Sequence, residues 1–173
     1  MYGSPETKRK SAMDGGNEVM TGPRLLTEGD WAGWHYWGEG DPFEAQSGPF
    51  FFKEEADGTI RCAFRAEKKH MNGGGFMHGG CMMTFADFAL FALAWRELNE
   101  SYAVTVSLNS EFIAPGAVGD LVEATGEVVK AGGSLIFLRG MLTTAGRPLM
   151  TFSGVIKKVK PRRCSSRSST SRR

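Results

Sequence analysis

A glycine-rich loop in the middle of this chain runs directly into a strongly apolar segment that contains one carboxylate. The loop occupies residues 72–80 and reads NGGGFMHGG, and the carboxylate belongs to Asp87. Glycine lets a ligand oxygen approach backbone N–H groups closely, and a buried carboxylate is unfavourable unless it has a partner or a chemical task. This combination predicts a site where a carbonyl group is polarised and attacked.

The apolar segment positions both parts of this candidate site. Residues 79–98 are apolar almost all round, which is typical of a buried helix, and Gly79 would be its first residue. Backbone N–H groups at the start of a helix are unpaired and carry partial positive charge. The Gly79 N–H is therefore the candidate donor to a carbonyl oxygen that gains negative charge. The alternative is that the glycines only form a tight turn with close packing.

Asp87 is the candidate general base or nucleophile. Its helical neighbours Met83, Leu90 and Phe91 are apolar, so we expect desolvation to raise the pKa of its carboxyl group. The alternative is an aspartate held in a salt bridge at a contact between helices, because buried acids are usually paired. Activation of water and direct attack on the carbonyl carbon are both open to this residue.

Cys81 offers a different nucleophile. It falls in the first turn of the predicted helix, where a thiolate is stabilised, and His78 lies three residues before it. A Cys/His nucleophile is therefore an alternative to Asp87. Met82 and Phe85 nearby favour a small, packed apolar residue at this position instead.

The segments around the helix predict an antiparallel sheet. Residues 49–54 and 60–66 are apolar-rich runs on either side of a glycine-bearing turn, a pattern typical of a β-hairpin. After the helix, short links separate four more predicted strands that would form a meander: residues 102–113, 121–130, 134–143 and 148–159. This order favours an α+β fold with an antiparallel sheet wrapped around one long central helix.

A tryptophan-rich segment precedes the hairpin. Trp31, Trp34 and Trp37 lie within residues 25–43 at helical spacing. We expect a short helix or loop that packs over the edge of the domain, and stacking on a carbohydrate is the alternative.

Charge and composition together divide the chain into three parts. From Lys157 onward there are eight basic residues and no acidic ones, whereas the preceding 156 residues carry 13 basic and 19 acidic residues, a net charge of −6. We predict a partly disordered N-terminal extension over residues 1–45, a globular domain over residues 46–160 and a basic disordered tail over residues 161–173. For this tail, contact with an anionic surface or RNA and a non-native origin both stay open.

The same features exclude several classes of protein. The acidic body argues against a nucleic-acid-binding domain. Cys62, Cys81 and Cys164 have no zinc-site spacing, and their odd number fits a reducing compartment. The polar N-terminus has no apolar h-region, so we expect no secretory signal, and no apolar run reaches the roughly 20 residues that span a bilayer. We therefore expect a cytoplasmic protein that binds neither nucleic acid nor membrane.

Several of these spacings together resemble the hotdog-fold thioesterases of the PaaI type. The matching pattern is Asn72, then His78-Gly79-Gly80 after five residues, then Asp87 after six more, and finally TVSLNSEFIAPG over residues 105–116. It extends over roughly residues 49–159 and leaves out the N-terminal 45 residues and the tail. The resemblance implies a hotdog domain that hydrolyses acyl- or aryl-coenzyme A (CoA) thioesters to the free acid and CoA without a metal or cofactor. It also implies sites at the interface of a homodimer, which often pairs into a homotetramer.

Besides Asp87 and Gly79, three further residues are candidates for the site. The resemblance implies that Asn72 donates from its amide to hold the loop or the thioester, and an Asx-type loop residue is the alternative. It implies that the Thr105 hydroxyl helps to place the attacking water, and an ordinary β-branched strand residue is the alternative. His78 has a supporting role, in which it orients the substrate or caps the loop by hydrogen bonding.

The dimensions of one helix then predict at least a dimer. Gly79 and Asp87 are eight residues apart, which is about 12 Å along a helix axis, whereas a reacting carbonyl needs both groups within about 3 Å. If both act, they come from two subunits whose helices lie antiparallel. Two rival functions stay open. One is a hotdog module that binds acyl-CoA without turnover, in which Asp87 would have little purpose, and the other is an enoyl-thioester hydratase, which needs a histidine paired with the acid.

Overall fold

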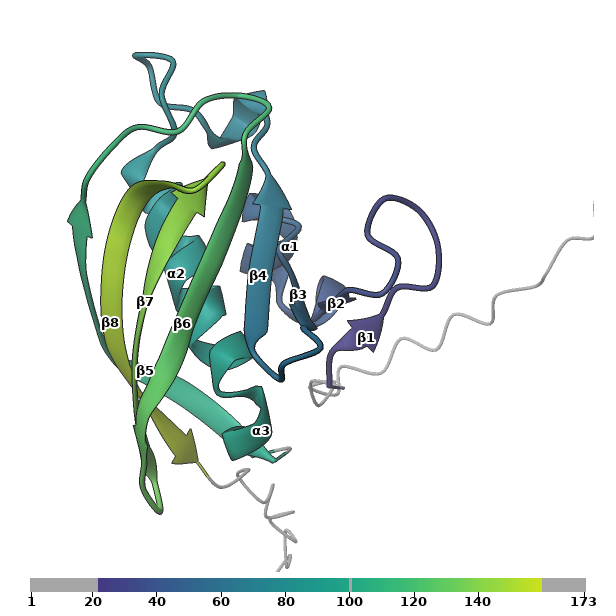
Figure 1. The fold of residues 1–173 in the computed structure, drawn as a ribbon, viewed down its shortest axis with the longest axis vertical. Helices are drawn as coiled ribbons and strands as arrows, with labels where there is room; N and C mark the ends of the chain where they lie inside the picture. The colour runs from purple at the N-terminus through teal and green to yellow at the C-terminus, as the bar shows by residue number, and fades with distance from the viewer. Residues whose placement is uncertain (1–21, 100, 160–173) are drawn as a thin grey trace, which may run out of the picture.

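One antiparallel sheet wraps around a single long helix (Figure 1). The computed structural model describes residues 22–99 and 101–159. The strands are β1 (Arg24–Leu25), β2 (His35–Tyr36), β3 (Phe51–Glu54), β4 (Ile60–Arg65), β5 (Tyr102–Phe112), β6 (Leu121–Ala131), β7 (Leu135–Thr144) and β8 (Arg147–Val159). The helices are α1 (Pro42–Ser47), α2 (Gly79–Leu93) and α3 (Trp95–Leu98), with short 3-10 helices η1 (Gly38–Gly40) and η2 (Lys68–His70). This is the predicted α+β hotdog architecture.

The sheet has the strand order β1-β2-β3-β4-β6-β7-β8-β5. The predicted hairpin is β3–β4, and Gly58 adopts a left-handed φ of +83° in its turn. The predicted four-strand meander is wrong in one respect: β6, β7 and β8 follow one another in the sheet, but β5 pairs with β8 and forms the edge. An alternating sequence pattern reveals that a strand exists, whereas its neighbour depends on long-range packing.

The central helix is shorter than the apolar run predicts. α2 ends at Leu93, and the chain turns at Ala94 (φ −91°, ψ 9°) before the separate short helix α3. The prediction of one continuous helix to residue 98 is therefore wrong over its last turn. Trp95 packs there against Phe52 of β3, with ring centroids 5.8 Å apart. This contact between distant parts of the chain is not visible in a local apolar pattern.

The sheet buries α2 on most sides. Phe85, Phe88 and Leu90 of this helix are at most 1% exposed. Gly154 of β8 lies directly against Leu90, because a Cβ atom at Gly154 would come within 2.5 Å of the Leu90 Cδ1 atom. The missing side chain lets the helix approach the sheet closely. This packing holds α2 in place, and with it the carboxylate of Asp87.

The tryptophan-rich segment extends the sheet. β1 pairs with β2, and β2 pairs with β3, so the prediction of a short helix or loop is wrong where these strands form. Packing over the domain edge is confirmed, since Trp31 stacks on Phe51 with centroids 4.2 Å apart and Trp37 stacks on Phe52 at 5.0 Å. The domain boundary predicted between residues 45 and 46 falls inside α1.

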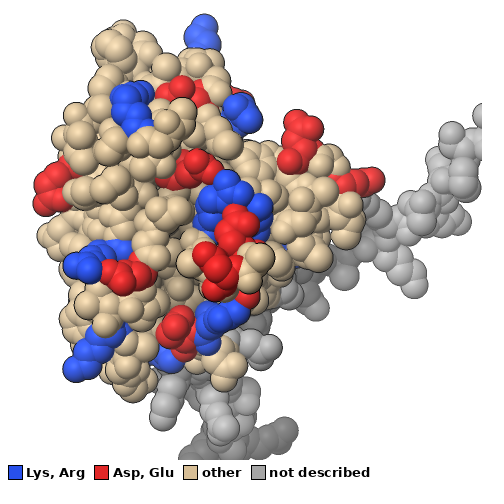
Figure 2. All heavy atoms as spheres, in the orientation of Figure 1, with Lys and Arg blue, Asp and Glu red and all other residues tan. Residues whose placement is uncertain are grey.

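Charged side chains of both signs are interspersed on the face that Figure 2 shows. Within residues 22–99 and 101–159, every helix is too short or too polar to cross a membrane. The predicted basic tail over residues 161–173 and the first 21 residues of the predicted N-terminal extension lie outside the described residues.

Candidate active site

The glycine-rich loop is closed by the side chain of Asn72. Its Oδ1 atom accepts hydrogen bonds from the N–H groups of Gly74 (2.8 Å) and Phe76 (3.2 Å). Gly75 adopts a left-handed φ of +81° within this turn. The Asn72 oxygen therefore has the Asx-type role, while the amide nitrogen takes part in neither of these two bonds and can serve as a donor.

His78 caps the start of α2. Its Nδ1 atom accepts a hydrogen bond of 2.8 Å from the Gly80 N–H, so His78 caps by hydrogen bonding, while orientation of the substrate by His78 stays a prediction. In the part of the chain that the structure describes, the Gly79 N–H donates to no protein acceptor. α2 therefore begins with an unpaired, positively polarised N–H at Gly79, as an oxyanion donor requires.

Asp87 lies eight residues further along α2 and is held by Thr105 of β5. The Thr105 hydroxyl donates to the Asp87 Oδ1 atom at 2.6 Å. The pairing of β5 with β8 shifts register between Thr105 and Ser107, and a bulge of this kind changes the direction of a neighbouring side chain. The structure thus brings together two of the residues that the sequence singles out.

Asp87 has no basic partner among the described residues, so the predicted alternative of a salt bridge is not observed there. Desolvation raises the pKa of its carboxyl group, the hydrogen bond from Thr105 lowers it, and the negative charge of Asp41 raises it again. The net direction is upward, which confirms the expected shift. A carboxylate with a raised pKa is better matched to proton transfer near neutral pH.

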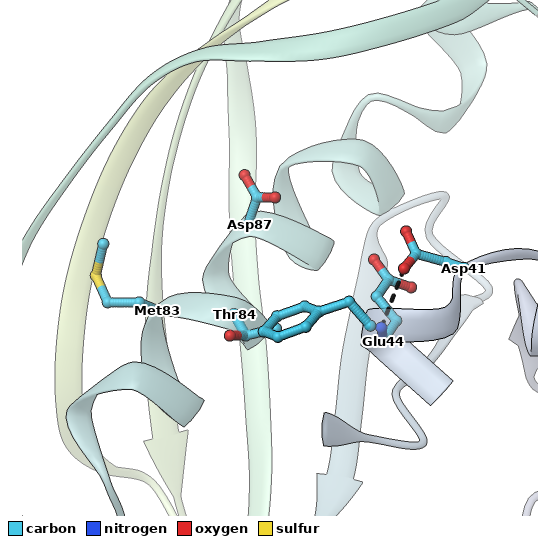
Figure 3. Close-up of a pocket in the computed structure, with 6 residues that line it drawn as sticks. Asp41, Glu44, Met83, Thr84 and Asp87 are labelled. Carbon is cyan, nitrogen blue, oxygen red and sulfur yellow. Dashed lines mark hydrogen bonds between the residues drawn. The ribbon is translucent and has the colours of Figure 1, made fainter. Parts of the chain in front are cut away.

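A pocket of about 340 Å³ lies beside Asp87, between α1 and α2 (Figure 3). Its lining residues are Asp41, Phe43, Glu44, Met83, Thr84 and Asp87. Sequence reasoning missed Asp41 and Glu44, because they precede the residues that the resemblance covers. The sequence does hold a signal for them: an acid, a proline and a second acid at residues 41, 42 and 44 are typical of a helix start.

Glu44 is strongly perturbed in this pocket. Desolvation and the negative charges of Asp41 and Asp87 raise the pKa of its carboxyl group to about 8. Like charges close together do not all ionise at neutral pH, so Glu44 carries a proton there.

The described residues contain no cluster of histidines, cysteines and acids with the geometry of a metal site.

The two predicted halves of the site line different pockets in the part of the chain that the structure describes. A second pocket of about 640 Å³ is lined by Phe43, Gln46, Ser47, Lys69, His70, His78, Gly80, Cys81 and Thr84. Phe43 and Thr84 border both pockets, but Asp87 borders only the first and His78 only the second. The pairing of a histidine with the acid that a hydratase needs is therefore not formed by His78 and Asp87 of one chain.

Cys81 does not have the properties of a nucleophile. Desolvation raises the pKa of its thiol to about 11, although the positive charge of Lys69 acts in the opposite direction. The net rise in this pKa disfavours the alternative of a Cys/His nucleophile. The interpretation of Cys81 as a small packed residue agrees with its partial burial against the core.

A match to a protein family decides what kind of protein carries this site. The model of the thioesterase superfamily matches residues 74–164, which is more than half of the chain and includes Gly79, Asp87 and Thr105. The chain belongs to the thioesterase superfamily. The predicted family is confirmed, and with it the general activity of a thioesterase.

Two relatives of this thioesterase agree with the assignment. The Pseudomonas aeruginosa protein PA0474 is 36% identical over 109 residues, which cover 62% of this chain and 81% of the relative. Human acyl-coenzyme A thioesterase 13 is 30% identical over 102 residues, which cover 58% of this chain and 72% of that enzyme.

Solved structures share the hotdog fold of this thioesterase. The Bacillus halodurans protein BH2602, determined with CoA, superposes with a TM-score of 0.60 at 26% identity and covers 64% of this chain and 74% of its own. The Escherichia coli PaaI protein superposes with a TM-score of 0.61 at 20% identity and covers 70% of this chain and 87% of its own. The PaaI-type fold that the sequence predicts is confirmed by these likenesses.

Proposed function

We propose that this thioesterase hydrolyses acyl- or aryl-CoA thioesters to the free acid and CoA, with Asp87 as general base or nucleophile. One observation carries the proposal: among the described residues no cation pairs with Asp87, yet Thr105 holds its carboxylate at the wall of a pocket. The substrate class is supported by a relative named as an acyl-CoA thioesterase and by a structural neighbour that contains CoA.

Thioester hydrolysis needs a group that delivers the nucleophile and a donor that stabilises the oxyanion. Asp87 accepts a proton from the attacking water, or it attacks the carbonyl carbon to form an anhydride that water then opens. Negative charge appears on the carbonyl oxygen, where an unpaired N–H stabilises it by about 10²–10³ in rate. The C–S bond then breaks, and the CoA sulfur takes up a proton.

The oxyanion donor in this proposal is the N–H of Gly79 from the partner subunit. Eight helical residues separate Gly79 from Asp87, about 12 Å along the axis, so one copy of α2 does not place both groups at one carbonyl. Each site would combine Asp87 and Thr105 of one subunit with the loop of Asn72, His78 and Gly79 of the other. The two α2 helices then lie antiparallel across a two-fold axis.

Strand β5 is the surface that we propose for this contact between subunits. It forms an edge of the sheet and exposes apolar side chains, including Tyr102 (45% exposed), Val104 (44%) and Val106 (57%). An edge strand with apolar side chains is a ready template for pairing with a second chain. Because α2 packs against β5 in each subunit, pairing of the two edges brings both helices to one interface. Pairing of dimers into a tetramer and the cytoplasmic location stay predictions.

Turnover of a panel of acyl- and aryl-CoA thioesters tests the function, with a thiol reagent trapping the released CoA. We expect at least one class of thioester to be hydrolysed by the wild type and none above background by Asp87→Ala. Calorimetry should show that Asp87→Ala still binds the same thioester. Full activity in Asp87→Ala rejects the mechanism, and binding without turnover in the wild type would identify a non-catalytic acyl-CoA-binding module.

Mixed dimers test the shared site. An Asp87→Asn chain is combined with a Gly79→Pro chain; proline lacks the N–H and suits the first position of a helix, and His78 (φ −67°, ψ 132°) already has a backbone conformation allowed before proline. One site of each heterodimer regains both groups. Random mixing makes half of the dimers mixed, so about one quarter of wild-type activity should return. No recovery, with heterodimers detected by mass spectrometry, contradicts the shared site.

A further inference from the structure

The pocket beside Asp87 contains a second carboxyl group, that of Glu44, for which the described part of the chain offers no hydrogen-bond or ion-pair partner. Glu44 and Asp87 line it from two different helices, α1 and α2 (Figure 3). Asp41, at the start of α1, completes the acidic part of its wall. Phe43, Met83 and Thr84 supply the rest, so these acids share a small space that is largely without basic groups.

The position of Glu44 in α1 would normally explain an acid without any chemistry. In a capping box the residue at the cap accepts from the N–H of the third helical residue, and the side chain of that third residue accepts in return. Only the first half forms here: the Asp41 Oδ1 atom accepts from the Glu44 N–H at 3.0 Å. The Asp41 N–H donates instead to the carbonyl of Gly38. The Glu44 carboxyl group is therefore left for the pocket.

Hydrogen bonds distinguish Glu44 from the other two acids. The Asp87 carboxylate accepts from Thr105, a bond that favours its ionised form, and the Asp41 Oδ1 atom accepts from the Glu44 N–H. Within residues 22–99 and 101–159, no donor is paired with the Glu44 carboxyl oxygens. Burial and the two negative neighbours raise the pKa of Glu44 to about 8, in agreement with this distinction.

Other titratable side chains line the adjoining pocket, which shares Phe43 with this one. Lys69, His70 and His78 line the adjoining pocket rather than the one that holds Glu44. The groups that face Glu44 are thus Asp41 from the residue before its own helix and Asp87 from α2. Both are negative, and neither neutralises Glu44 if it ionises.

We propose that Glu44 is a second catalytic residue of this site, a carboxylic acid that donates its proton to the departing sulfur of the substrate. The role rests on the proposed thioester hydrolysis. Two carboxyl groups whose surroundings separate their protonation states can divide acid and base work between them. Asp87 is then the base or nucleophile, and Glu44 is the acid.

The protons balance over one cycle. Water gives one proton to the Asp87 carboxylate, and its oxygen bonds to the carbonyl carbon. When the C–S bond breaks, the electron pair stays on sulfur, and the Glu44 carboxylic acid gives its proton to that sulfur to form the thiol. Asp87 then holds the proton taken from water while Glu44 lacks one, and transfer of that proton through the pocket from Asp87 to Glu44 restores the starting state. No other reactant is needed.

Thioesters with different leaving thiols test this role. One acyl group is attached to N-acetylcysteamine, whose alkyl thiolate resembles that of CoA, and to a nitrophenyl thiol, whose thiolate leaves without protonation. Wild type, Glu44→Gln and the matched acid-to-amide control Glu28→Gln, at an exposed position between β1 and β2, are compared. We expect Glu44→Gln to lower kcat/KM about 10- to 100-fold for the alkyl thioester and less than about threefold for the aryl thioester.

The pH dependence of kcat/KM provides a second test of the acid role of Glu44. For the alkyl thioester, wild-type kcat/KM should fall as pH rises past about 8, where Glu44 loses its proton, and this limb should be absent in Glu44→Gln. Equal losses on both thioesters, or an unchanged pH limb, overturn the acid role. A wild type that hydrolyses no thioester at all rejects the proposed function itself. An active wild type whose Glu44→Gln variant shows no dependence on the leaving thiol rejects only the acid role of Glu44.

Discussion

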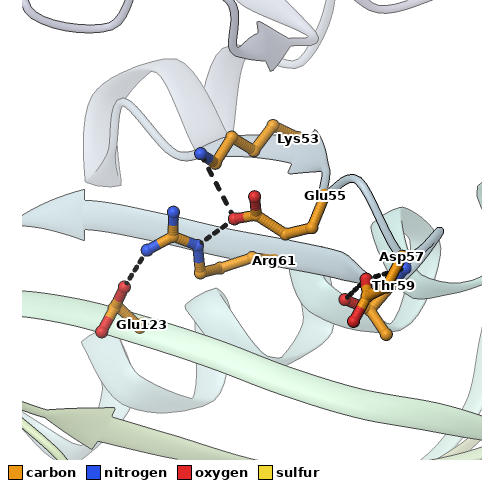
Figure 4. Close-up of polar contacts among 6 residues, drawn as sticks. All are labelled: Lys53, Glu55, Asp57, Thr59, Arg61 and Glu123. Carbon is orange, nitrogen blue, oxygen red and sulfur yellow. Dashed lines mark hydrogen bonds and ion pairs between the residues drawn. The ribbon is translucent and has the colours of Figure 1, made fainter.

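Two groups of carboxylates in this protein have opposite surroundings. On the outer surface of β3, β4 and β6, Arg61 bridges Glu55 and Glu123 at 2.6 and 2.7 Å, and Lys53 adds a third contact to Glu55 at 3.2 Å (Figure 4). Desolvation of Glu55 raises the pKa of its carboxyl group, but the hydrogen bonds and positive charges of Arg61 and Lys53 together outweigh it, so this pKa is lowered.

The pocket between α1 and α2 shows the reverse. Asp41, Glu44 and Asp87 line it together, and burial followed by mutual repulsion raises the pKa of both Glu44 and Asp87. Folding would favour a neutral residue at such positions. Acids that remain unpaired in a concave site are candidates for chemistry, whereas paired acids on a surface are candidates for stability. Carboxylates therefore have two roles in this protein: ion pairing on the surface, and the proposed chemistry in the pocket.

The largest expected effect comes from removing the charge of Asp87. Asp87→Asn keeps the size of the side chain but neither accepts a proton nor attacks a carbonyl, so kcat should fall by about 10²–10⁴. Glu123→Gln makes the matching change in the surface group, and its kcat should stay within about twofold of the wild type. Steady-state turnover of the best CoA thioester measures both. Similar losses in the two variants would remove the distinction between the groups.

Glu44 should dominate how stability changes with pH. In the unfolded chain its pKa returns to 4.5, whereas in the folded protein it is about 8. Because the folded protein binds the Glu44 proton more tightly than the unfolded chain, Glu44 contributes to the unfolding free energy. This contribution is complete below about pH 4.5 and is lost as pH rises to about 8. Between these limits the wild type should lose about 2–4 kcal/mol more unfolding free energy than Glu44→Gln.

Urea unfolding at about pH 5 and about pH 8 measures this difference, with both proteins at one concentration so that self-association is equal. Titrating groups that do not interact with Glu44 are common to the two proteins and cancel. Parallel stability curves would show that Glu44 is ionised in the folded protein, and the contrast with the surface carboxylates would then rest on Asp87 alone.

Thr105 should have an intermediate effect, because it moderates the pKa of Asp87. Thr105→Val removes the hydroxyl that lowers this pKa, so the acidic limb of the kcat/KM profile should move to higher pH and activity near neutral pH should fall about 10-fold. Thr105→Ser keeps the hydroxyl and should preserve the limb. An unmoved limb in Thr105→Val would contradict a direct action on Asp87.

Features with a local cause were predictable from the sequence. The helix start at Gly79 follows from a glycine loop that meets an apolar run, and the hairpin follows from the Gly58 turn. The raised pKa of Asp87 follows from its apolar helical neighbours. The resemblance added Thr105, whose hydrogen bond to Asp87 no local pattern reveals.

Features that depend on long-range packing were not predictable in this way. The pairing of β5 with β8, the end of α2 at Leu93 and the strands of the tryptophan-rich segment are decided by contacts between distant residues. Glu44 is the clearest case. Its sequence signal is that of a helix start, and only the packing of α1 against α2 places its carboxyl group in the pocket of Asp87.

The smallest effect is expected at the paired carboxylates. Arg61→Met keeps the length of the side chain and removes its charge, but Glu55 retains Lys53 and both acids remain partly hydrated. Exposed ion pairs contribute little, so the Tm should fall by less than about 4 °C, and the difference should shrink further at about 1 M salt. The kcat for a CoA thioester should not change. A large, salt-insensitive fall in Tm would mean that this surface group is a stronger structural element than its exposure suggests, and a fall in kcat would mean that the two groups of carboxylates are coupled.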